Sequence, residues 1–171
     1  LAFYRKDETM VTDYPLVDIT TRIADLKNTK YPMIGEKSEE VTLGIFNLST
    51  KKTVFAQVED FTNERYLTSI TWGPEEKYIY IGVLNRGQDH LKLNKYEAET
   101  GKFIKTLFEE KSDRYVEPEH QLIFVAGLED QFIWFSERDG YNHLYLYDTE
   151  GKMIKQLTSG SWVVKDFMGF D

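Results

Sequence analysis

Two stretches of the sequence repeat one strand-and-turn pattern at a nearly constant spacing, and this repeat restricts the fold more than any other feature. Residues 77–107 and 131–157 both alternate apolar and polar side chains between turns that contain glycine. His90 and His143 occupy matching positions 53 residues apart, and the later segments GKFIKTL and GKMIKQL match at an offset of 50. A period of about 50 residues built from short strands is typical of β-propeller blades.

The second copy shows how one unit is built. Three consecutive antiparallel strands are predicted over residues 132–136, 143–147 and 152–157. Because side chains alternate along a strand, Leu144 and Leu146 point to one face while Tyr145 and Tyr147 point to the other. A sheet with one face in water would instead alternate apolar with charged residues. The pattern therefore predicts sheets buried on both faces, as stacked blades are.

A further strand precedes each of these hairpins, over Tyr66–Gly73 and His120–Gly127, which gives four strands per unit. A third, less regular copy combines a strand at the start of the chain with a hairpin over Glu40–Ala56, and Thr9–Glu39 is an insertion between them. We expect an all-β chain of about three to three and a half four-stranded antiparallel blades of a β-propeller. The predicted units cover residues 1–60, 61–115 and 116–163, and residues 164–171 are expected to begin a further blade.

Two other folds are compatible with parts of this pattern. A β-sandwich also has short strands and turns, although sandwiches do not usually repeat turn chemistry at a fixed offset. The segment Val17–Thr29 has some helical periodicity, but it is rich in Thr and Asp, so an extended conformation is an equal alternative.

The composition excludes several classes of function. Aromatic residues make up 15% of the chain, which favours strands. The formal net charge of -8 argues against a nucleic-acid partner, because a nucleic-acid-binding face must be basic. The absence of cysteine excludes disulfides, thiolate metal sites and a cysteine nucleophile. No run of 18 apolar residues is present. The first residues already have the pattern of a strand, so we expect the chain to be part of a longer protein.

Four segments, in this order, carry a resemblance to a known family. They are LAFYRKDETMVTDYPLVD (1–18), YPMIGEKSEEVTLGIFNL (31–48), ITWGPEEKYIYIGVLNRGQDHLKL (70–93) and FIWFSERDGYNHLYLYDTEGKMIKQLTSGSWVV (132–164). The chain resembles the dipeptidyl peptidase IV group of the prolyl oligopeptidase family, and more narrowly its bacterial members. The segment SERDGYNHLYLYD and the Tyr-Pro-x-x-Gly motif are the more specific parts of the resemblance.

The resemblance implies a fold and a function for the parent protein. In this family an eight-bladed N-terminal propeller covers a C-terminal α/β-hydrolase domain of the same chain. The parent would release Xaa-Pro or Xaa-Ala dipeptides from the amino termini of peptide substrates by serine acyl transfer. This chain would then enclose the catalytic cavity and gate access to it. The resemblance also implies a periplasmic, secreted or membrane-anchored location in a bacterium. No cofactor and no metal are expected.

The family's catalytic machinery is not expected within this chain. The serine nucleophile of the family lies in a Gly-x-Ser-x-Gly turn, and the sequence contains no such motif. A pair of glutamates that binds the substrate's amino terminus normally precedes the AFYR strand. The glutamate pairs present do not lie in that context: Glu39-Glu40, Glu75-Glu76 and Glu109-Glu110.

One part of the substrate site is nevertheless predicted. Alternate connections of a four-stranded meander emerge on the same face, so Asn85–Asp89, Glu137–Tyr141 and Glu110–Pro118 are expected to lie together. In the family an aromatic residue and an arginine on one inter-blade loop approach the substrate. The resemblance makes Tyr115 and Arg114 the candidates here. The alternative is a loop aromatic packed beneath the next blade.

Other polar residues of the repeat are assigned structural roles. His90 and His143 begin equivalent hairpin strands, where each is expected to bond a neighbouring group. With His120 remote and no cysteine, the histidines have no recognisable zinc-ligand spacing. Arg86 and Arg138 each lie beside a turn glycine and are expected to pair with carboxylates of an adjacent blade.

A second class of function is a stand-alone propeller or β-sandwich module that binds a protein or a glycan without enzymatic activity. In either case, an incomplete ring of blades would leave two large apolar faces uncovered, and such faces drive association. We therefore expect the isolated chain to self-associate, and a homo-oligomer is a possible state of the parent.

Overall fold

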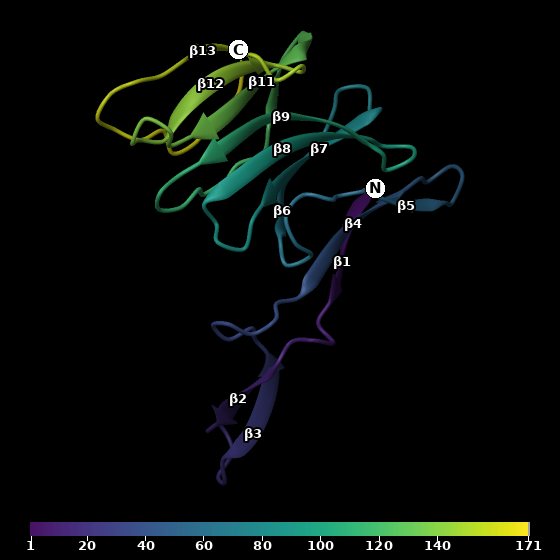
Figure 1. The fold of residues 1–171 in the computed structure, drawn as a ribbon, viewed down its shortest axis with the longest axis vertical. Helices are drawn as coiled ribbons and strands as arrows, with labels where there is room; N and C mark the ends of the chain where they lie inside the picture. The colour runs from purple at the N-terminus through teal and green to yellow at the C-terminus, as the bar shows by residue number, and fades with distance from the viewer. Residues whose placement is uncertain (171) are drawn as a thin grey trace.

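The computed structural model describes residues 1–170, which form 13 β-strands and no helix (Figure 1). Within this part of the chain no helix is therefore available to cross a membrane. The strands are β1 (Ala2–Asp7), β2 (Asp13–Asp18), β3 (Asp25–Lys30), β4 (Glu40–Phe46), β5 (Thr53–Phe55), β6 (Tyr66–Trp72), β7 (Tyr78–Leu84), β8 (His90–Glu97), β9 (Phe103–Lys111), β10 (Ile123–Val125), β11 (Leu128–Ser136), β12 (His143–Asp148) and β13 (Met153–Gln156). Of the two alternatives for Val17–Thr29, the extended one is correct, because this segment lies in the β2–β3 hairpin.

Two of the sheets are four-stranded antiparallel meanders, with orders β6-β7-β8-β9 and β10-β11-β12-β13. Their strands are rich in β-branched and aromatic residues, as in YIYIGVL of β7. His90 begins β8 and His143 begins β12, so the residues that match in sequence also match in structure. The predicted four-stranded unit is therefore confirmed for these two repeats.

The first sheet has three strands, which are the opening strand and the hairpin expected for the less regular first copy. Its order is β1-β4-β5, and these strands correspond to β7, β8 and β9 of the next sheet. No strand within residues 1–170 occupies the place that β6 takes in the second sheet. The outer edge of β1 consequently presents backbone groups that are not paired in a ladder.

The three sheets stack in succession, and the middle sheet is buried on both faces. Toward the first sheet, Ile79, Ile81 and Val83 of β7 pack against Leu43 and Ile45 of β4. This stacking of three sheets in succession is the arrangement of propeller blades rather than of a two-sheet sandwich. The predicted all-β propeller architecture is confirmed.

The opposite face of the middle sheet packs against the third sheet. Here Leu91 and Leu93 of β8 lie against Phe132, Trp134 and Tyr145, in a cluster that also includes stacked aromatic rings. The two faces of the third sheet follow the predicted alternation. Its tyrosines, Tyr145 and Tyr147, belong to this inter-sheet core, while Leu144 and Leu146 belong to a separate cluster on the far face.

The same glycine contact recurs between successive sheets. Gly101 and Gly151 occupy equivalent turns, and both have positive φ, 71° and 92°. A Cβ atom added to Gly101 would lie 2.1 Å from the carbonyl oxygen of Phe55, and one added to Gly151 would lie 2.1 Å from that of Leu107. In each case the turn therefore rests directly on the backbone of the last strand of the preceding sheet. Only glycine combines this backbone conformation with so close an approach.

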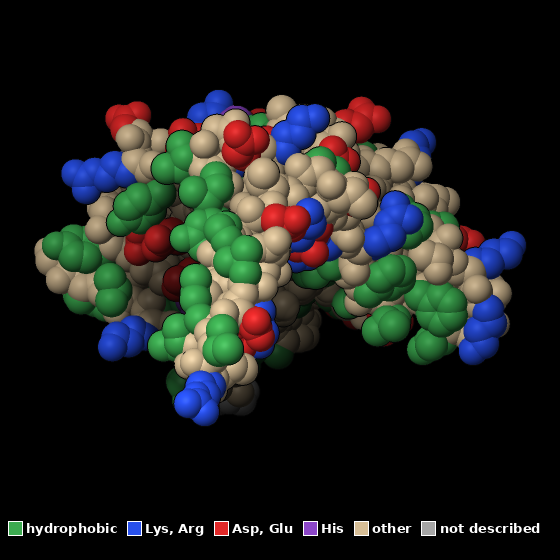
Figure 2. Space-filling view, turned by 90° about the horizontal axis from the view of Figure 1, so that it is seen from below, with side chains coloured by type: hydrophobic (Ala, Val, Ile, Leu, Met, Phe, Trp, Pro, Cys, Tyr) green, Lys and Arg blue, Asp and Glu red, His purple; other side chains and the backbone are tan. Residues whose placement is uncertain are grey.

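The insertion between β1 and β4 forms an arm that extends away from the stacked sheets (Figure 1). The arm is the two-stranded β2–β3 hairpin. It exposes several apolar side chains: Leu16, Val17, Ile19, Ile23 and Leu26. Seen from below, the surface shows hydrophobic side chains interspersed with charged ones (Figure 2). The arm therefore has no hydrophobic core of its own within the described residues.

The C-terminal segment covers part of the far face of the third sheet. Val164 and Phe167 pack against the cluster formed by Ile133, Phe135 and Leu144. The described residues after β13 form no strand. The first strand of a blade needs the second strand of that blade as its partner, so the expectation that residues 164–171 begin a further blade stays a prediction. Residue 171 lies outside the described residues.

Candidate functional site

Three segments from different parts of the sequence meet at one end of the second and third sheets. The loop after β9 is hydrogen-bonded to the turn between β7 and β8: the amide of Ser112 donates to the carbonyl of Asp89 at 3.0 Å, and that of Val116 to Gln88 at 2.7 Å. The turn between β11 and β12 lies across a pocket from the same loop. The three connections lie together, as expected from the alternation of connections in a meander.

The pocket between the loop and the turn has a volume of about 440 Å³. Its walls come from the end of β9, the loop through Pro118, the end of β11 and the turn that follows. Both candidate residues, Arg114 and Tyr115, line it, together with Trp134 and Arg138. The pocket therefore combines aromatic surface with groups of both charges, a composition suited to a polar peptide rather than to a purely apolar ligand.

Arg114 and Tyr115 form the exposed tip of the loop. The amide of Arg114 donates to the hydroxyl of Ser112 at 3.1 Å, which shapes the turn. Tyr115 is 53% exposed, and within residues 1–170 neither side chain makes a hydrogen bond or an ion pair. A free guanidinium can donate to peptide carbonyls or carboxylates, and a tyrosine ring can pack on a peptide side chain. Contact with substrate stays a prediction for both residues.

The inner wall of the pocket is a charged pair that joins the second and third sheets. Glu110 of β9 forms an ion pair with Arg138, which lies in the turn after β11. The carboxylate of Glu110 also accepts a hydrogen bond from the indole Nε1 of Trp134 at 3.0 Å. The predicted pairing of Arg138 with a carboxylate of an adjacent blade is confirmed. The Trp134–Glu110 bond was not predicted, because no sequence signal connects residues across this gap.

The aromatic surroundings of Arg138 strengthen the pair. Its guanidinium carbon lies 4.4 Å from the centre of the Tyr145 ring, and its Nε donates to the hydroxyl of Ser136 at 2.9 Å. Burial lowers the pKa of Arg138, but the carboxylate of Glu110 and the hydroxyl of Tyr147 outweigh this effect and raise the pKa above its ordinary value. The side chain therefore stays charged and fixed.

The histidines have structural surroundings. His90 contacts the Glu109 carboxylate through Nε2 at 2.7 Å, and this bond holds the pKa of Glu109 below its ordinary value. His143 is fully buried, with both ring nitrogens at hydrogen-bonding distance from polar groups. The ring of His120 stacks on Phe135 at 3.9 Å. Among residues 1–170, no group of three or more His, Cys, Asp or Glu side chains is placed to hold a metal ion.

Arg86 also bonds groups outside its own sheet. Its Nη1 lies 3.3 Å from the Glu64 carboxylate, and its Nη2 donates to the carbonyl of Glu36 at 3.0 Å. Glu36 lies between β3 and β4, and Glu64 lies between β5 and β6. Arg86 therefore bonds both of these connecting segments to the turn after β7. Arg86 thus pairs with a carboxylate, but Glu64 lies in the segment before β6, within the same predicted unit 61–115, and not in an adjacent blade as expected.

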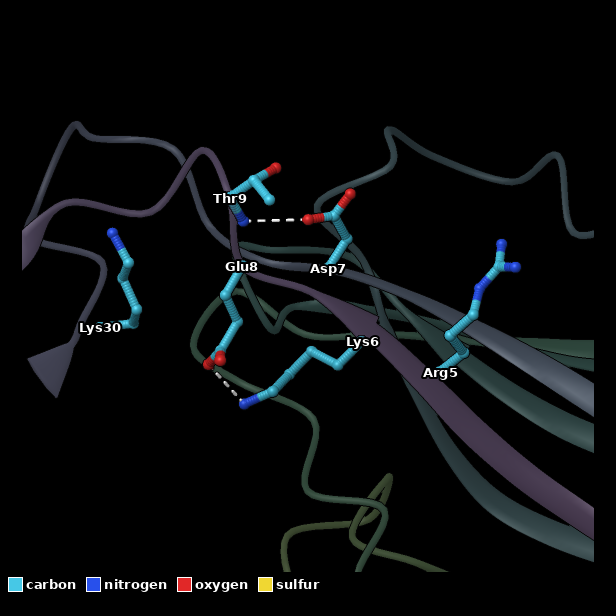
Figure 3. Close-up of a pocket in the computed structure, with 6 residues that line it drawn as sticks. All are labelled: Arg5, Lys6, Asp7, Glu8, Thr9 and Lys30. Atoms are coloured by element: carbon cyan, nitrogen blue, oxygen red, sulfur yellow. Dashed lines mark hydrogen bonds and ion pairs between the residues drawn. The ribbon is translucent and has the colours of Figure 1, made fainter.

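A second pocket, which the sequence did not predict, lies between the end of β1 and the base of the arm (Figure 3). Arg5 and Lys30 lie on opposite sides of it. Its other charges are already satisfied: Lys6 pairs with Glu8 at 2.7 Å, and the amide of Thr9 bonds the Asp7 carboxylate at 2.9 Å. Because its polar groups are paired locally and it is open to solvent, this pocket is the weaker candidate for a ligand site.

Comparisons with known proteins agree with this architecture. The family model described as the dipeptidyl peptidase IV (DPP IV) N-terminal region matches residues 1–171. A protein named "Probable dipeptidyl-aminopeptidase B" from Pyrenophora tritici-repentis is 27% identical over 97% of this chain. The chain spans 22% of the length of that relative, so it corresponds to about a fifth of a full-length protein.

Two crystal structures are similar over 99% of the chain. One, from Bacteroides ovatus ATCC 8483, is described as a dipeptidyl aminopeptidase IV; it has a TM-score of 0.90 and 44% sequence identity, and the chain covers 26% of it. The other is Porphyromonas gingivalis dipeptidyl peptidase 4, with a TM-score of 0.84, 29% identity and 24% of its chain covered.

Proposed function

The chain belongs to the N-terminal region of the dipeptidyl peptidase IV family, and from this relationship we propose that it is a non-catalytic section of the propeller of a serine dipeptidyl-peptidase. The observation that carries the proposal is the family match over the whole chain, together with the likeness to the two solved structures. The parent would release Xaa-Pro or Xaa-Ala dipeptides from peptide amino termini. A stand-alone binding module is not favoured by these relationships.

Within the parent, this section would limit which molecules reach the catalytic cavity. Stacked sheets with buried faces form a rigid wall, and the loops at one end of the sheets form the 440 Å³ pocket. Arg114 and Tyr115 are proposed to contact the peptide substrate from this end. The nucleophile would come from a C-terminal α/β-hydrolase domain, since the sequence of this chain has no Gly-x-Ser-x-Gly turn.

Three further features of the parent are proposed. The repeat units are assigned to residues 1–60, 61–115 and 116–163, each corresponding to one blade. The exposed apolar side chains of the arm support a homo-oligomer. By family relationship, the protein would be periplasmic, secreted or membrane-anchored.

Activity of the full-length protein tests the proposed function. Purified full-length protein should release p-nitroaniline from Gly-Pro-p-nitroanilide, and not from the same substrate with its amino group blocked by succinylation. The 171-residue chain alone should release none, because it lacks a nucleophile activated by a base. Equal rates on the free and blocked substrates, or turnover by the chain alone, would refute the proposal.

A further inference from the structure

The geometry of the pocket points to a role for the charged pair that forms its inner wall. We propose that Glu110 and Arg138 are positioning residues, which hold the loop bearing Arg114 and Tyr115 in the orientation that binds peptide. The inference rests on the proposed function of that loop. It differs from a purely structural role, because it predicts an effect on substrate binding that a loss of inter-sheet stability would not produce.

Glu110 lies at the root of the loop. It is the last residue but one of β9, and the loop begins after Lys111. Its side chain is only 12% exposed and is bonded on the third-sheet side to Arg138 and to Trp134. The orientation of the strand end is thus fixed by groups that belong to the opposite wall of the pocket.

The other side of the loop is held by the second sheet. Besides the amides of Ser112 and Val116, the carbonyl of Pro118 accepts bonds from the hydroxyls of Thr68 and Ser69, each at 3.4 Å. The loop tip is therefore supported between two sheets. Loss of the support from the third sheet would let the tip move relative to the opposite wall, and small displacements of binding groups weaken binding strongly.

Replacement of one member of the pair should have a specific effect. Glu110→Gln keeps the size of the side chain and an acceptor for Trp134, but it leaves the charge of Arg138 without its partner in a partly buried place. The guanidinium is then free to shift toward solvent, and the end of β9 loses its fixed contact. The expected result is weaker binding of substrate with an unchanged chemical step.

The chain offers a matched control. Lys105 and Glu150 also join β9 to the third sheet, with Nζ donating to the Glu150 carbonyl at 2.7 Å and lying 3.0 Å from its carboxylate. Glu150 lies in the turn between β12 and β13 and Lys105 lies near the start of β9, at the opposite end of the same two sheets from the pocket. Glu150→Gln removes a carboxylate from an inter-sheet pair without touching the loop.

The experiment measures kcat and KM for Gly-Pro-p-nitroanilide in the full-length protein, with the thermal midpoint of each variant. Glu110→Gln should raise KM by about tenfold with kcat within about twofold, and Glu150→Gln should change neither. In a background of Arg114→Ala and Tyr115→Ala, which itself raises KM, adding Glu110→Gln should have no further effect, because residues that act through one another are not additive. If Glu110→Gln does not fold, Arg138→Lys serves as the second variant, with the same expected rise in KM.

Each result decides a different point. The variant with both Arg114→Ala and Tyr115→Ala is called the loop variant. If the loop variant raises KM but Glu110→Gln leaves KM unchanged, the positioning role is wrong and the proposed function stands. The same holds if the effects of the two variants on KM add fully. An equal rise in KM for Glu150→Gln would also overturn the positioning role. If the loop variant itself leaves KM unchanged, the substrate role of the loop fails, and the positioning role fails with it.

Discussion

At the scale of single residues, His90 and His143 show how one position of a repeat can serve two environments. His143 has no exposed surface; its Nε2 donates to the carbonyl of Gly160 at 3.0 Å, and its Nδ1 lies 3.1 Å from the hydroxyl of Thr158. His90 is partly exposed and pairs with a surface carboxylate. The matching position in sequence predicts a bonded histidine in both cases, but it does not predict burial.

The two histidines should therefore differ in their contribution to stability. His143→Ala removes a fully buried ring together with its hydrogen bonds to Gly160 and Thr158, so it should destabilise the protein by about 3 kcal/mol. His90→Ala loses a surface contact and should cost less than about 1 kcal/mol. Thermal or urea midpoints of the two variants in the full-length protein check this difference, and equal shifts would contradict it.

The sequence does not predict which residues a polar side chain bonds in a neighbouring sheet. Arg138 was expected to pair with an adjacent blade, because it lies beside a turn glycine at the edge of a sheet. Neither Glu110 nor Trp134 could be named as its neighbour, since that depends on how far one sheet is displaced along the next. The same holds for Asp60, whose carboxylate accepts from the buried amide of Asn94 at 2.6 Å.

At the scale of elements, the turns carry the contacts that set the spacing of the sheets. Gly140 and Gly151 have similar positive φ, 96° and 92°. An added Cβ atom at Gly140 would meet no atom within 4 Å, whereas one at Gly151 would meet the backbone of β9. The two glycines therefore separate the effect of backbone conformation from the effect of close packing.

Alanine substitutions should reveal this difference. Gly140→Ala should cost about 1 kcal/mol, because it places a Cβ atom on a residue with positive φ. Gly151→Ala carries the same cost and also forces the third sheet away from the second, so it should lower stability by at least about twice as much. Thermal denaturation midpoints of the two full-length variants check this prediction. A larger loss of stability for Gly140→Ala than for Gly151→Ala would contradict it.

Most strands could be predicted from the alternation of apolar residues, and one segment was left undecided for a physical reason. The strand at 143–147 was correct to within one residue of β12. The first unit has the three strands expected from the opening strand and the hairpin over Glu40–Ala56, and no described strand takes the place of β6. The sequence of Val17–Thr29 was compatible with a helix and with an extended conformation. The extended conformation forms because β2 pairs with β3.

At the scale of the whole molecule, the stacking of sheets leaves apolar surface at both ends of the described chain. Phe3 and Tyr4 of β1 are exposed, as are Met153 and Ile154 of β13. The apolar side chains of the arm add to this surface. Patches of this kind mark places where a protein associates with another surface.

The isolated 171-residue chain should therefore self-associate at micromolar concentration. Sedimentation velocity over a dilution series should show a weight-average coefficient that rises with concentration. The full-length protein is the control, because its additional blades should cover the outer sheet faces and hold its state constant over the same range. A single monomeric species of the isolated chain at every concentration would contradict the prediction.

The arm leaves and re-enters the sheet between two strands that are direct neighbours, with Asp7 opposite Glu40. The distance between its two ends is thus fixed by a ladder that does not depend on what lies between them. Residues gained or lost near the tip, between Ile19 and Ile23, leave the register of that ladder unchanged. The tip is accordingly a suitable place to attach a fluorophore or an affinity tag without altering the blades.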